Sequence, residues 1–340
     1  MSRVKIAIVG LNFGRHILEQ LQTEPAKSCI ELAAVCDMDR KKAEEAAAKY
    51  GVPYYTSIDE LLGNAEIPAI GLYTGPNGRA GLIRQLIRAG KDVMTTKPFE
   101  LDPAAAADVL QEAAKLGRVV HLNSPSPTLP NDLQQLEKWR THLNLGRPVA
   151  ARADVTVRYN EKADGSWYDD PHRCPVAPIF RLGIYLINDL IRICGLPESV
   201  TVMQSRIFTG RPTSDNAALS ILFKNGAIGN VFASFCVDDG QLYRNSLTVN
   251  FERGTVYRNV GPVQGKQRLQ VVMKKPDSSL HTDEMECPEP VSGAYQWEVF
   301  ARAVRGEKIG DLPPEQIVAG VQVLAAMMRA ERSGLPEKVA

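Results

Sequence analysis

The sequence predicts an α/β chain, with a doubly wound parallel sheet in its N-terminal part and an α+β domain with a large, mainly antiparallel open sheet after it. Buried strands alternate regularly with helices up to Leu122, and alternating apolar and polar runs replace this pattern later in the chain. Between the two patterns, the prolines of Asn123–Pro130 exclude a helix or a central strand. We therefore expect a first domain of residues 1–123 and a second domain of residues 124–340.

The first domain consists of short apolar runs, each followed by a helical pattern or a turn. The predicted strands are Val4–Val9, Glu31–Cys36, Val52–Thr56, Ala69–Tyr73, Asp92–Thr95 and Arg118–Leu122. In a parallel sheet, ligands bind beyond the carboxyl ends of the strands. Here those ends are Gly10, Asp37, Thr74, Thr96 with Lys97, and Asn123.

The turn after the first strand is a candidate ligand-binding loop. The strand stops at Gly10, and a helical pattern that includes Phe13 and Ile17 starts almost at once. Such a turn directs free N–H groups and the positive end of a helix dipole at one spot, where a pyrophosphate can bind. The pattern departs from the G-x-G-x-x-G fingerprint, because Asn12 occupies the second glycine position and Gly14 comes one position early.

The acid at the end of the second strand supports dinucleotide binding. A carboxylate at Asp37 can accept hydrogen bonds from the ribose 2′-OH and would repel a 2′-phosphate, so NAD is favoured over NADP. Arg40 can neutralise part of that preference, which leaves NADP possible. The alternative is an ordinary βαβ turn with a solvated aspartate. The order of strand, turn, helix, strand and acid favours the dinucleotide.

The second domain shows strand-like alternation and three helical patterns. The predicted strands are Ala151–Tyr159, Val200–Phe208, Ala217–Phe223, Ala227–Val237, Ser246–Phe251 and Arg268–Lys274. Asn225-Gly226 joins two of them with a strong hairpin signal. The predicted helices are Ile179–Cys194, Ala294–Arg305 and Glu315–Arg332. This half is therefore expected to be a largely antiparallel sheet with a few helices.

Composition favours a small-molecule partner. The 40 Lys and Arg residues nearly balance the 39 Asp and Glu residues, and no basic run marks a nucleic-acid or anionic membrane surface. No apolar run is long enough to cross a bilayer. The N-terminus leads directly into the first strand, so we expect no signal peptide.

The cysteines and histidines predict neither disulfides nor a metal site. None of the six cysteines forms a C-x-x-C pair, and most lie in apolar segments, as buried thiols of a reducing cytoplasm do. The five histidines lack H-E-x-x-H spacing, so we expect no metal. A cytoplasmic location is the corresponding expectation.

Two residues stand out as candidates for chemistry. Lys97 follows a buried strand, and Pro98 keeps it out of helical geometry, so its ammonium can reach both a bound cofactor and a substrate hydroxyl. The alternative is a solvated loop lysine. Tyr185 lies one helical turn from both Arg181 and Asp189, and a nearby cation would lower the pKa of the phenol and favour proton exchange. The alternative is an amphipathic helix with a wet face.

The motifs VGLNFGRH, VCDMDR, YTGPN, GKDVMTTKPF and FRLGIYLINDLIRICG resemble the Gfo/Idh/MocA oxidoreductases over essentially the whole chain. The resemblance implies an N-terminal Rossmann domain and a lysine, here Lys97, that bridges nicotinamide and substrate. It also implies that Tyr185 replaces the usual helix histidine as proton donor or acceptor. A loop over the substrate would correspond to Trp167–Asp170, which is otherwise simply a surface loop.

The sequence departs from the family pattern at several positions. The glutamate before the lysine is Thr96, the usual helix aspartate is Arg181, and the Gly-Gly lead-in is Ala177-Pro178. The histidine common after the T-P motif is missing near Arg79-Ala80. An arginine in place of an aspartate reverses a charge where substrate hydroxyls would bind. Either the substrate is anionic, with a carboxylate or phosphate, or the ordinary dehydrogenase chemistry is weakened.

We therefore expect an NAD(P)-dependent dehydrogenase or reductase that acts on a CH–OH group of a sugar or polyol, possibly carboxylated or nucleotide-linked. The expected catalytic residues are Lys97 and Tyr185. The expected cofactor-binding residues are Gly10, Leu11, Asn12, Phe13, Gly14, Asp37, Met38, Arg40, Thr74, Gly75, Pro76, Asn77, Thr96 and Lys97. The expected substrate-binding residues are Asn123, Trp167, Asp169, His172, Arg181 and Asp189.

A non-catalytic function is the alternative hypothesis to this dehydrogenase. The family also includes a sugar-regulon repressor-inhibitor that uses its dinucleotide site for regulation, and loss of motif residues suits such a sensor. Retention of Lys97 and Tyr185 favours the enzyme. The resemblance, together with an open sheet in the second half, also implies a homodimer or homotetramer.

Overall fold

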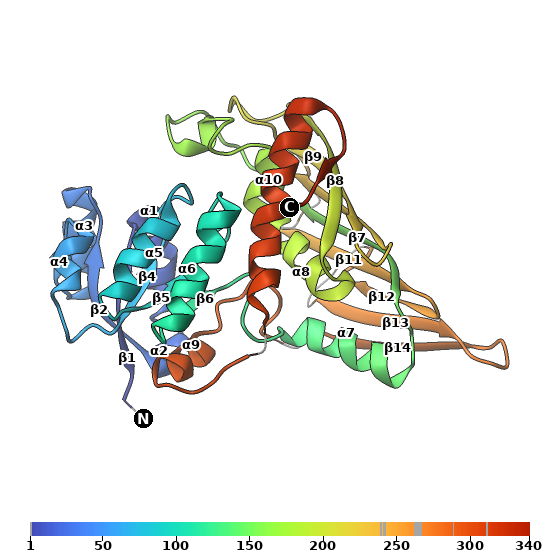
Figure 1. Cartoon of the computed structure of the whole chain (residues 1–340), viewed down its shortest axis with the longest axis horizontal. Helices are drawn as coiled ribbons and strands as arrows, with labels where there is room; N and C mark the ends of the chain where they lie inside the picture. The colour runs from blue at the N-terminus through green and yellow to red at the C-terminus, as the bar shows by residue number, and fades with distance from the viewer. Residues whose placement is uncertain (1, 239, 241–242, 262–266, 288, 311) are drawn as a thin grey trace. The chain divides into compact units, whose positions relative to one another are not determined.

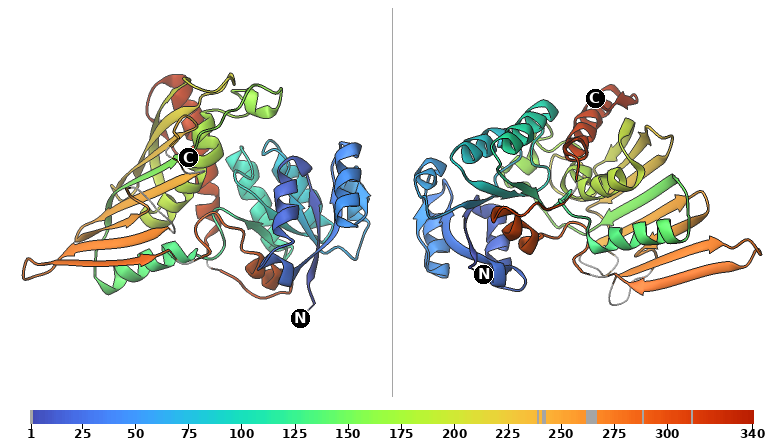
Figure 2. Two further views of the ribbon diagram at one scale, coloured as in Figure 1. Left: turned by 180° about the vertical axis from the view of Figure 1, so that it is seen from behind. Right: turned by 60° about the horizontal axis from the view of Figure 1, so that its bottom comes forward.

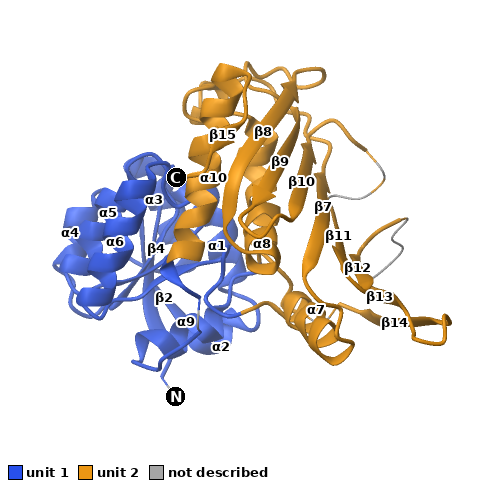
Figure 3. Cartoon of the chain, turned by 45° about the vertical axis from the view of Figure 1, so that its right-hand side comes forward, with its two compact units in different colours: residues 1–128, 294–314 blue, residues 129–293, 315–340 orange. Residues whose placement is uncertain are grey.

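The computed structural model describes residues 2–238, 240, 243–261, 267–287, 289–310 and 312–340. The chain divides into two compact units, one of residues 1–128 with 294–314 and one of residues 129–293 with 315–340 (Figure 3).

The first unit contains a six-stranded parallel sheet in the order β3-β2-β1-β4-β5-β6 (Figure 1). Its strands are β1 (Val4–Val9), β2 (Ile30–Cys36), β3 (Tyr54–Tyr55), β4 (Ala69–Leu72), β5 (Asp92–Thr95) and β6 (Val120–Leu122). The strand order reverses between β1 and β4, so right-handed crossovers put helices on both faces. This is the Rossmann order, and it confirms the predicted parallel sheet.

The helices of the first unit follow from ordinary capping and burial. They are α1 (Leu11–Gln20), α2 (Ala26–Cys29), α3 (Arg40–Tyr50), α4 (Ile58–Leu62), α5 (Arg79–Arg88), α6 (Pro103–Lys115) and α9 (Trp297–Val304). Asp39 caps α3 and Asp102 caps α6, each by accepting from two backbone N–H groups of the first turn. The core packs apolar residues of α1, α2, α3 and α9 against the central strands.

The division into units differs from the predicted domains at two places. The first unit extends to residue 128 rather than 123, and residues 294–314, predicted in the second domain, belong to it. Trp297 and Phe300 explain this return of the chain, because both are buried in the core that contains β1. Burial of two large aromatic side chains is worth several kcal/mol.

The second unit contains a nine-stranded sheet in the order β14-β13-β12-β11-β7-β10-β9-β8-β15. The strands are β7 (Pro148–Thr156), β8 (Pro197–Ser205), β9 (Asn216–Phe223), β10 (Ile228–Ser234), β11 (Arg244–Phe251), β12 (Gly254–Arg258), β13 (Arg268–Lys274), β14 (Leu280–Glu286) and β15 (Glu337–Lys338). Neighbouring strands pair antiparallel except β7 and β10, which are parallel. The predicted mainly antiparallel sheet is therefore confirmed.

The described helices of this unit lie on one face of the sheet (Figures 1 and 2). They are α7 (Asn131–His142), α8 (Ile184–Cys194) and α10 (Pro314–Ser333), with a short turn of 3₁₀ helix at Trp167–Asp169. The predicted helix Ile179–Cys194 begins instead with a π-helical turn, Ile179–Gly183, and α8 continues from it. Its apolar side chains Ile187, Leu190 and Ile191 are buried.

Two negative findings concern the described residues alone. None of their helices combines the length and apolarity that a bilayer crossing requires. Among the same residues, histidine, cysteine and acidic side chains do not gather into a group that could hold a metal ion.

His121 on β6 generates a pH prediction for stability. The ring is fully buried and lies edge-on to Phe300, with 5.6 Å between the ring centres, and neither ring nitrogen has a hydrogen-bond partner among the residues that the structure describes. Burial lowers the pKa of His121 from 6.5 to about 3. The unfolded chain therefore binds a proton below pH 6.5 that the folded chain rejects, so stability falls as the pH drops from 6.5 toward 3.

We expect His121→Met to gain about 2 kcal/mol relative to wild type between pH 7 and pH 5, because the variant lacks this proton linkage. Urea unfolding at the two pH values measures the change. The control is His142→Met at the exposed end of α7, which should track wild type. A wild type and a His121→Met variant with parallel pH profiles would contradict the account.

Candidate functional site

The turn between β1 and α1 requires glycine. Gly10 has φ +85°, and a Cβ on it would lie 2.9 Å from the backbone C and O of Tyr73. Its N–H donates to the Cys36 carbonyl at 2.9 Å, which joins the turn to the end of β2. The turn therefore lies at the carboxyl end of β1, where the strand order reverses between β1 and β4. Sheets of this kind bind ligands at that position.

The start of α1 is open to an anion. Its N-cap residue, Gly10, has no side chain that could cap the helix, and the first turn contains no acidic residue. Asp37 accepts a hydrogen bond from the Leu11 N–H at 2.7 Å and another from the Asp39 N–H at 2.9 Å. Asp37 is thus fixed beside the turn by backbone donors.

Two cations, Arg40 and Lys42, follow Asp37 in the chain, and both have partners on the protein. The Arg40 Nε donates to Glu44 at 2.8 Å, and its Nη2 donates to the Tyr54 hydroxyl at 3.3 Å. Lys42 donates to the Asn12 side-chain oxygen at 2.8 Å. Hydrogen bonding to Arg40 lowers the pKa of Glu44. The neighbouring Phe13 and Met38 side chains are exposed.

A buried arginine joins the ends of β4 and β5. The Arg79 guanidinium, 2% exposed, donates to the carbonyls of Thr96 at 2.7 Å and Pro98 at 3.0 Å, and also to the carbonyl of Thr74. These acceptors belong to, or directly follow, the two segments that the sequence predicts at the cofactor, Thr74–Asn77 and Thr96-Lys97. Arg79 therefore sets the spacing of these loops, and sequence reasoning recorded it only as a departure.

Asn123 and Glu100 complete this edge of the sheet. The Asn123 side-chain oxygen accepts from the Thr96 hydroxyl at 3.2 Å and from the Lys97 N–H at 3.3 Å. Glu100, also 2% exposed, accepts from the Ala80 N–H of α5 at 2.8 Å. The predicted residues Thr96, Lys97 and Asn123 are thus brought together within the first unit.

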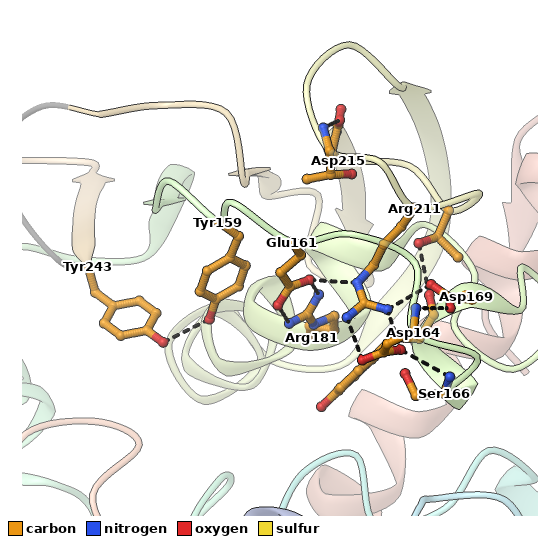
Figure 4. Close-up of polar contacts among 12 residues, drawn as sticks. Tyr159, Glu161, Asp164, Ser166, Asp169, Arg181, Arg211, Asp215 and Tyr243 are labelled. Atoms are coloured by element: carbon orange, nitrogen blue, oxygen red, sulfur yellow. Dashed lines mark hydrogen bonds and ion pairs between the residues drawn. The ribbon is translucent and has the colours of Figure 1, made fainter.

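In the second unit, Arg181 is bound by acidic and aromatic side chains (Figure 4). Both of its terminal nitrogens donate to the Glu161 carboxylate at 2.7 Å. Its guanidinium carbon lies 4.2 Å from the centre of the Tyr168 ring, 4.7 Å from that of Phe235 and 5.0 Å from that of Tyr159. Because Glu161 matches its charge, Arg181 gives no argument for an anionic substrate.

Arg211 extends the same network, as Figure 4 shows. It donates to Glu161 at 2.9 Å, Asp164 at 2.9 Å and Asp169 at 2.7 Å. Burial would raise the pKa of Glu161, but hydrogen bonds from Arg181 and Arg211 outweigh it and lower the pKa. The sequence gives no signal for Glu161 or Arg211, because their partners are distant in the chain.

The remaining predicted substrate residues have different surroundings. The Trp167 ring lies 4.1 Å from the ring of Tyr168, next to the Arg181 network. His172 is exposed, and its N–H donates to the Asp170 side chain at 2.8 Å. Asp169 is bound to Arg211, and Asp189 is 3% exposed and bound to Arg258 at 3.1 Å. Both carboxylates are therefore engaged within the unit.

Two family descriptions match the chain. Residues 4–124 match "Oxidoreductase family, NAD-binding Rossmann fold", and residues 133–257 match "GFO/IDH/MocA C-terminal domain". Among curated proteins, an inositol 2-dehydrogenase/D-chiro-inositol 3-dehydrogenase of Lactiplantibacillus plantarum is 27% identical over 190 residues, which are 54% of this chain and 53% of that protein. The chain spans about half the length of curated relatives that it matches.

Solved structures share the fold over the whole chain. An oxidoreductase of Desulfitobacterium hafniense, named as NADPH-dependent, has a TM-score of 0.81 at 15% identity, covering 99% of this chain and 98% of that one. The WlbA dehydrogenase of Bordetella pertussis, in complex with NADH and UDP-GlcNAcA, has a TM-score of 0.74 at 17% identity. It covers 100% of this chain and 99% of that one.

The contacts of Arg79 generate a stability prediction. Arg79→Met should lower the free energy of unfolding by about 2–4 kcal/mol, because it leaves carbonyls of both loops without their buried donor. The matched control on the same helix is Arg84→Met. Arg84 pairs with Glu112 at a partly exposed site, so its loss should cost less than about 1 kcal/mol. Equal losses in urea unfolding would show that Arg79 does not hold the loops.

Proposed function

Because the chain belongs to the Gfo/Idh/MocA family of oxidoreductases, we propose that it transfers hydride between nicotinamide and a carbon of a sugar or other polyol. The observation that carries the proposal is the loop edge of the first unit, where Thr96, Lys97 and Asn123 meet. Arg79 joins this edge to Thr74, whose backbone lies against Gly10. The names of relatives support the substrate class, since they include an inositol dehydrogenase and a D-glucoside 3-dehydrogenase.

The residues of the first unit fit a dinucleotide. Gly10 leaves the turn without a side chain, and the first turn of α1, which has no acidic residue, would offer N–H groups to a pyrophosphate. Asp37 would accept from the adenosine ribose, which favours NAD. Arg40 is held by Glu44 and Tyr54, so it would have to leave both to bind a 2′-phosphate. We therefore propose NAD as the preferred cofactor, with NADP as the alternative.

When bound, the nicotinamide supplies the hydride acceptor or donor. Lys97 would stabilise the charge that develops on the substrate oxygen, and Tyr185 would take or return its proton. The substrate-binding residues expected from the sequence would hold the reacting carbon over the ring.

The charges around Arg181 favour a neutral substrate. Glu161 already neutralises Arg181, and Asp164 and Asp169 surround Arg211. A neutral polyol therefore needs no further counter-charge from these side chains. A carboxylated or nucleotide-linked sugar, suggested by the UDP-GlcNAcA in WlbA, is the alternative.

A dinucleotide-binding regulator is the competing function. The replacement of the family glutamate by Thr96 favours it, because Thr96 cannot supply a carboxylate beside the lysine. A sensor would bind NAD and leave every sugar unoxidised.

Association into a homodimer or homotetramer, through the sheet face that carries no described helix, is compatible with either function.

Lys97→Ala should lower turnover by roughly a hundredfold or more while the Kd for NAD changes little, because the ammonium acts on charge that develops during the reaction. A screen of sugars, inositols, uronic acids and nucleotide sugars for NADH formation identifies the substrate, and fluorescence titration gives the Kd. Lys115→Ala, at an exposed position of α6, is the matched control.

Unchanged turnover in Lys97→Ala would remove Lys97 from the mechanism. Tight NAD binding with no substrate in the screen would favour the regulator.

A further inference from the structure

A cluster of buried charges lies in the second unit at the start of α7. Asp132, Asp189 and Arg258 are each 3% exposed or less. They come from α7, α8 and β12, and the Arg258 guanidinium donates to Asp132 at 2.5 Å and to Asp189 at 3.1 Å. A second Arg258 nitrogen donates to Asn245 of β11 at 2.9 Å. Four elements are thus joined through one guanidinium.

The cluster holds a chain segment that has no regular structure of its own. The Ser292 hydroxyl donates to Asp189, and the Ser292 N–H donates to Asp132 at 3.1 Å. The Pro290 carbonyl accepts from the Asn131 N–H at 3.0 Å. The two carboxylates that bind Arg258 therefore also fix the backbone at Ser292 from two sides.

This segment is in contact with Tyr185. The next residue, Gly293, has φ +90°, and a Cβ on it would lie 3.1 Å from both Cδ1 and Cε1 of Tyr185. The ring thus packs against the Gly293 backbone, with no room for a side chain between them. Asp189 is also one turn along α8 from Tyr185, so the carboxylate that binds Ser292 and the ring that packs on Gly293 lie on the same face of the helix.

We propose that Asp189, with Asp132 and Arg258, is a positioning group that holds the Ser292–Gly293 segment against Tyr185 and so fixes the direction of its phenol. Asp189 then acts through the protein rather than on the substrate. The inference rests on the proposed function only for the proton transfer assigned to Tyr185, and the packing relation stands without it. A buried, fully hydrogen-bonded network of this kind specifies one geometry, because any other leaves charges unpaired.

The burial of Asp189 supports this positioning role. Burial is the largest cause that raises the pKa of Asp189, to about 6. The positive charge of Arg258 lowers this pKa, and the negative charge of Asp132 raises it further. Arg192, on the same helix, faces Asp189 as a further positive charge. A carboxylate in this setting is costly unless its hydrogen bonds are kept, so the Ser292 donor is part of what stabilises it.

The test follows the ring of Tyr185 directly in the full chain. 3-Fluorotyrosine is placed at position 185 alone, and its ¹⁹F NMR signal is recorded in variants of the segment. Ser292→Ala should shift or broaden the signal, Ser292→Thr should restore it because the hydroxyl is kept, and Gly293→Ala should shift it because the new methyl group meets the ring.

Two controls match these changes chemically. Ser333→Ala removes a hydroxyl that donates to Glu337 at 3.1 Å on the surface, and Gly306→Ala adds a methyl group at φ +88° with no atom within 4 Å. Both should leave the signal unchanged. If Gly293→Ala fails to fold, the Ser292 pair alone decides.

A Tyr185 signal that is the same in Ser292→Ala as in Ser333→Ala would overturn the proposal. Once a substrate is known, Ser292→Ala should also lower kcat roughly tenfold to a hundredfold with the KM for NAD unchanged. A shifted signal in a protein that oxidises no substrate supports the positioning role and counts against the proposed function alone, so the two can fail separately.

Discussion

The candidate site depends on the hydrogen bonds that bind backbone carbonyls in the loops where parallel strands end. A parallel sheet brings its strand ends to one edge, and the loops that leave it carry carbonyls that no ladder partner can bind. Here one buried guanidinium, that of Arg79, binds carbonyls of Thr74, Thr96 and Pro98. Lys97 lies between two of those residues, so its backbone is fixed by a group that the reaction itself does not involve.

The second unit differs from the first in that it buries many charged side chains. Arg181 and Arg211 are matched by three carboxylates in one network, and Arg258 by two in another. Buried charges of this kind contribute little net stability, but each network holds loops of distant sequence in one arrangement. The arginine that looks in the sequence like an anion site is therefore a structural partner of Glu161.

The sequence predicted the architecture because periodicity and strand ends are local features. The parallel sheet, Gly10 and Asp37 at strand ends, and the edge formed by Thr96, Lys97 and Asn123 all follow from such patterns. Sequence reasoning missed α7, although Leu133, Leu136 and Trp139 recur at helical spacing and are buried. It also could not place residues 294–314 or pair Glu161 with Arg181, since these depend on contacts between segments distant in the chain.

We propose that Lys97 and Tyr185 act on the same reacting oxygen. A double-mutant cycle of Lys97→Ala and Tyr185→Phe, measured as the single-turnover rate of hydride transfer, tests this proposal. We expect strong coupling, with the double variant reacting about as slowly as the slower single variant. Rate losses that simply multiply in the double variant would show that the two residues act independently, and would contradict the account.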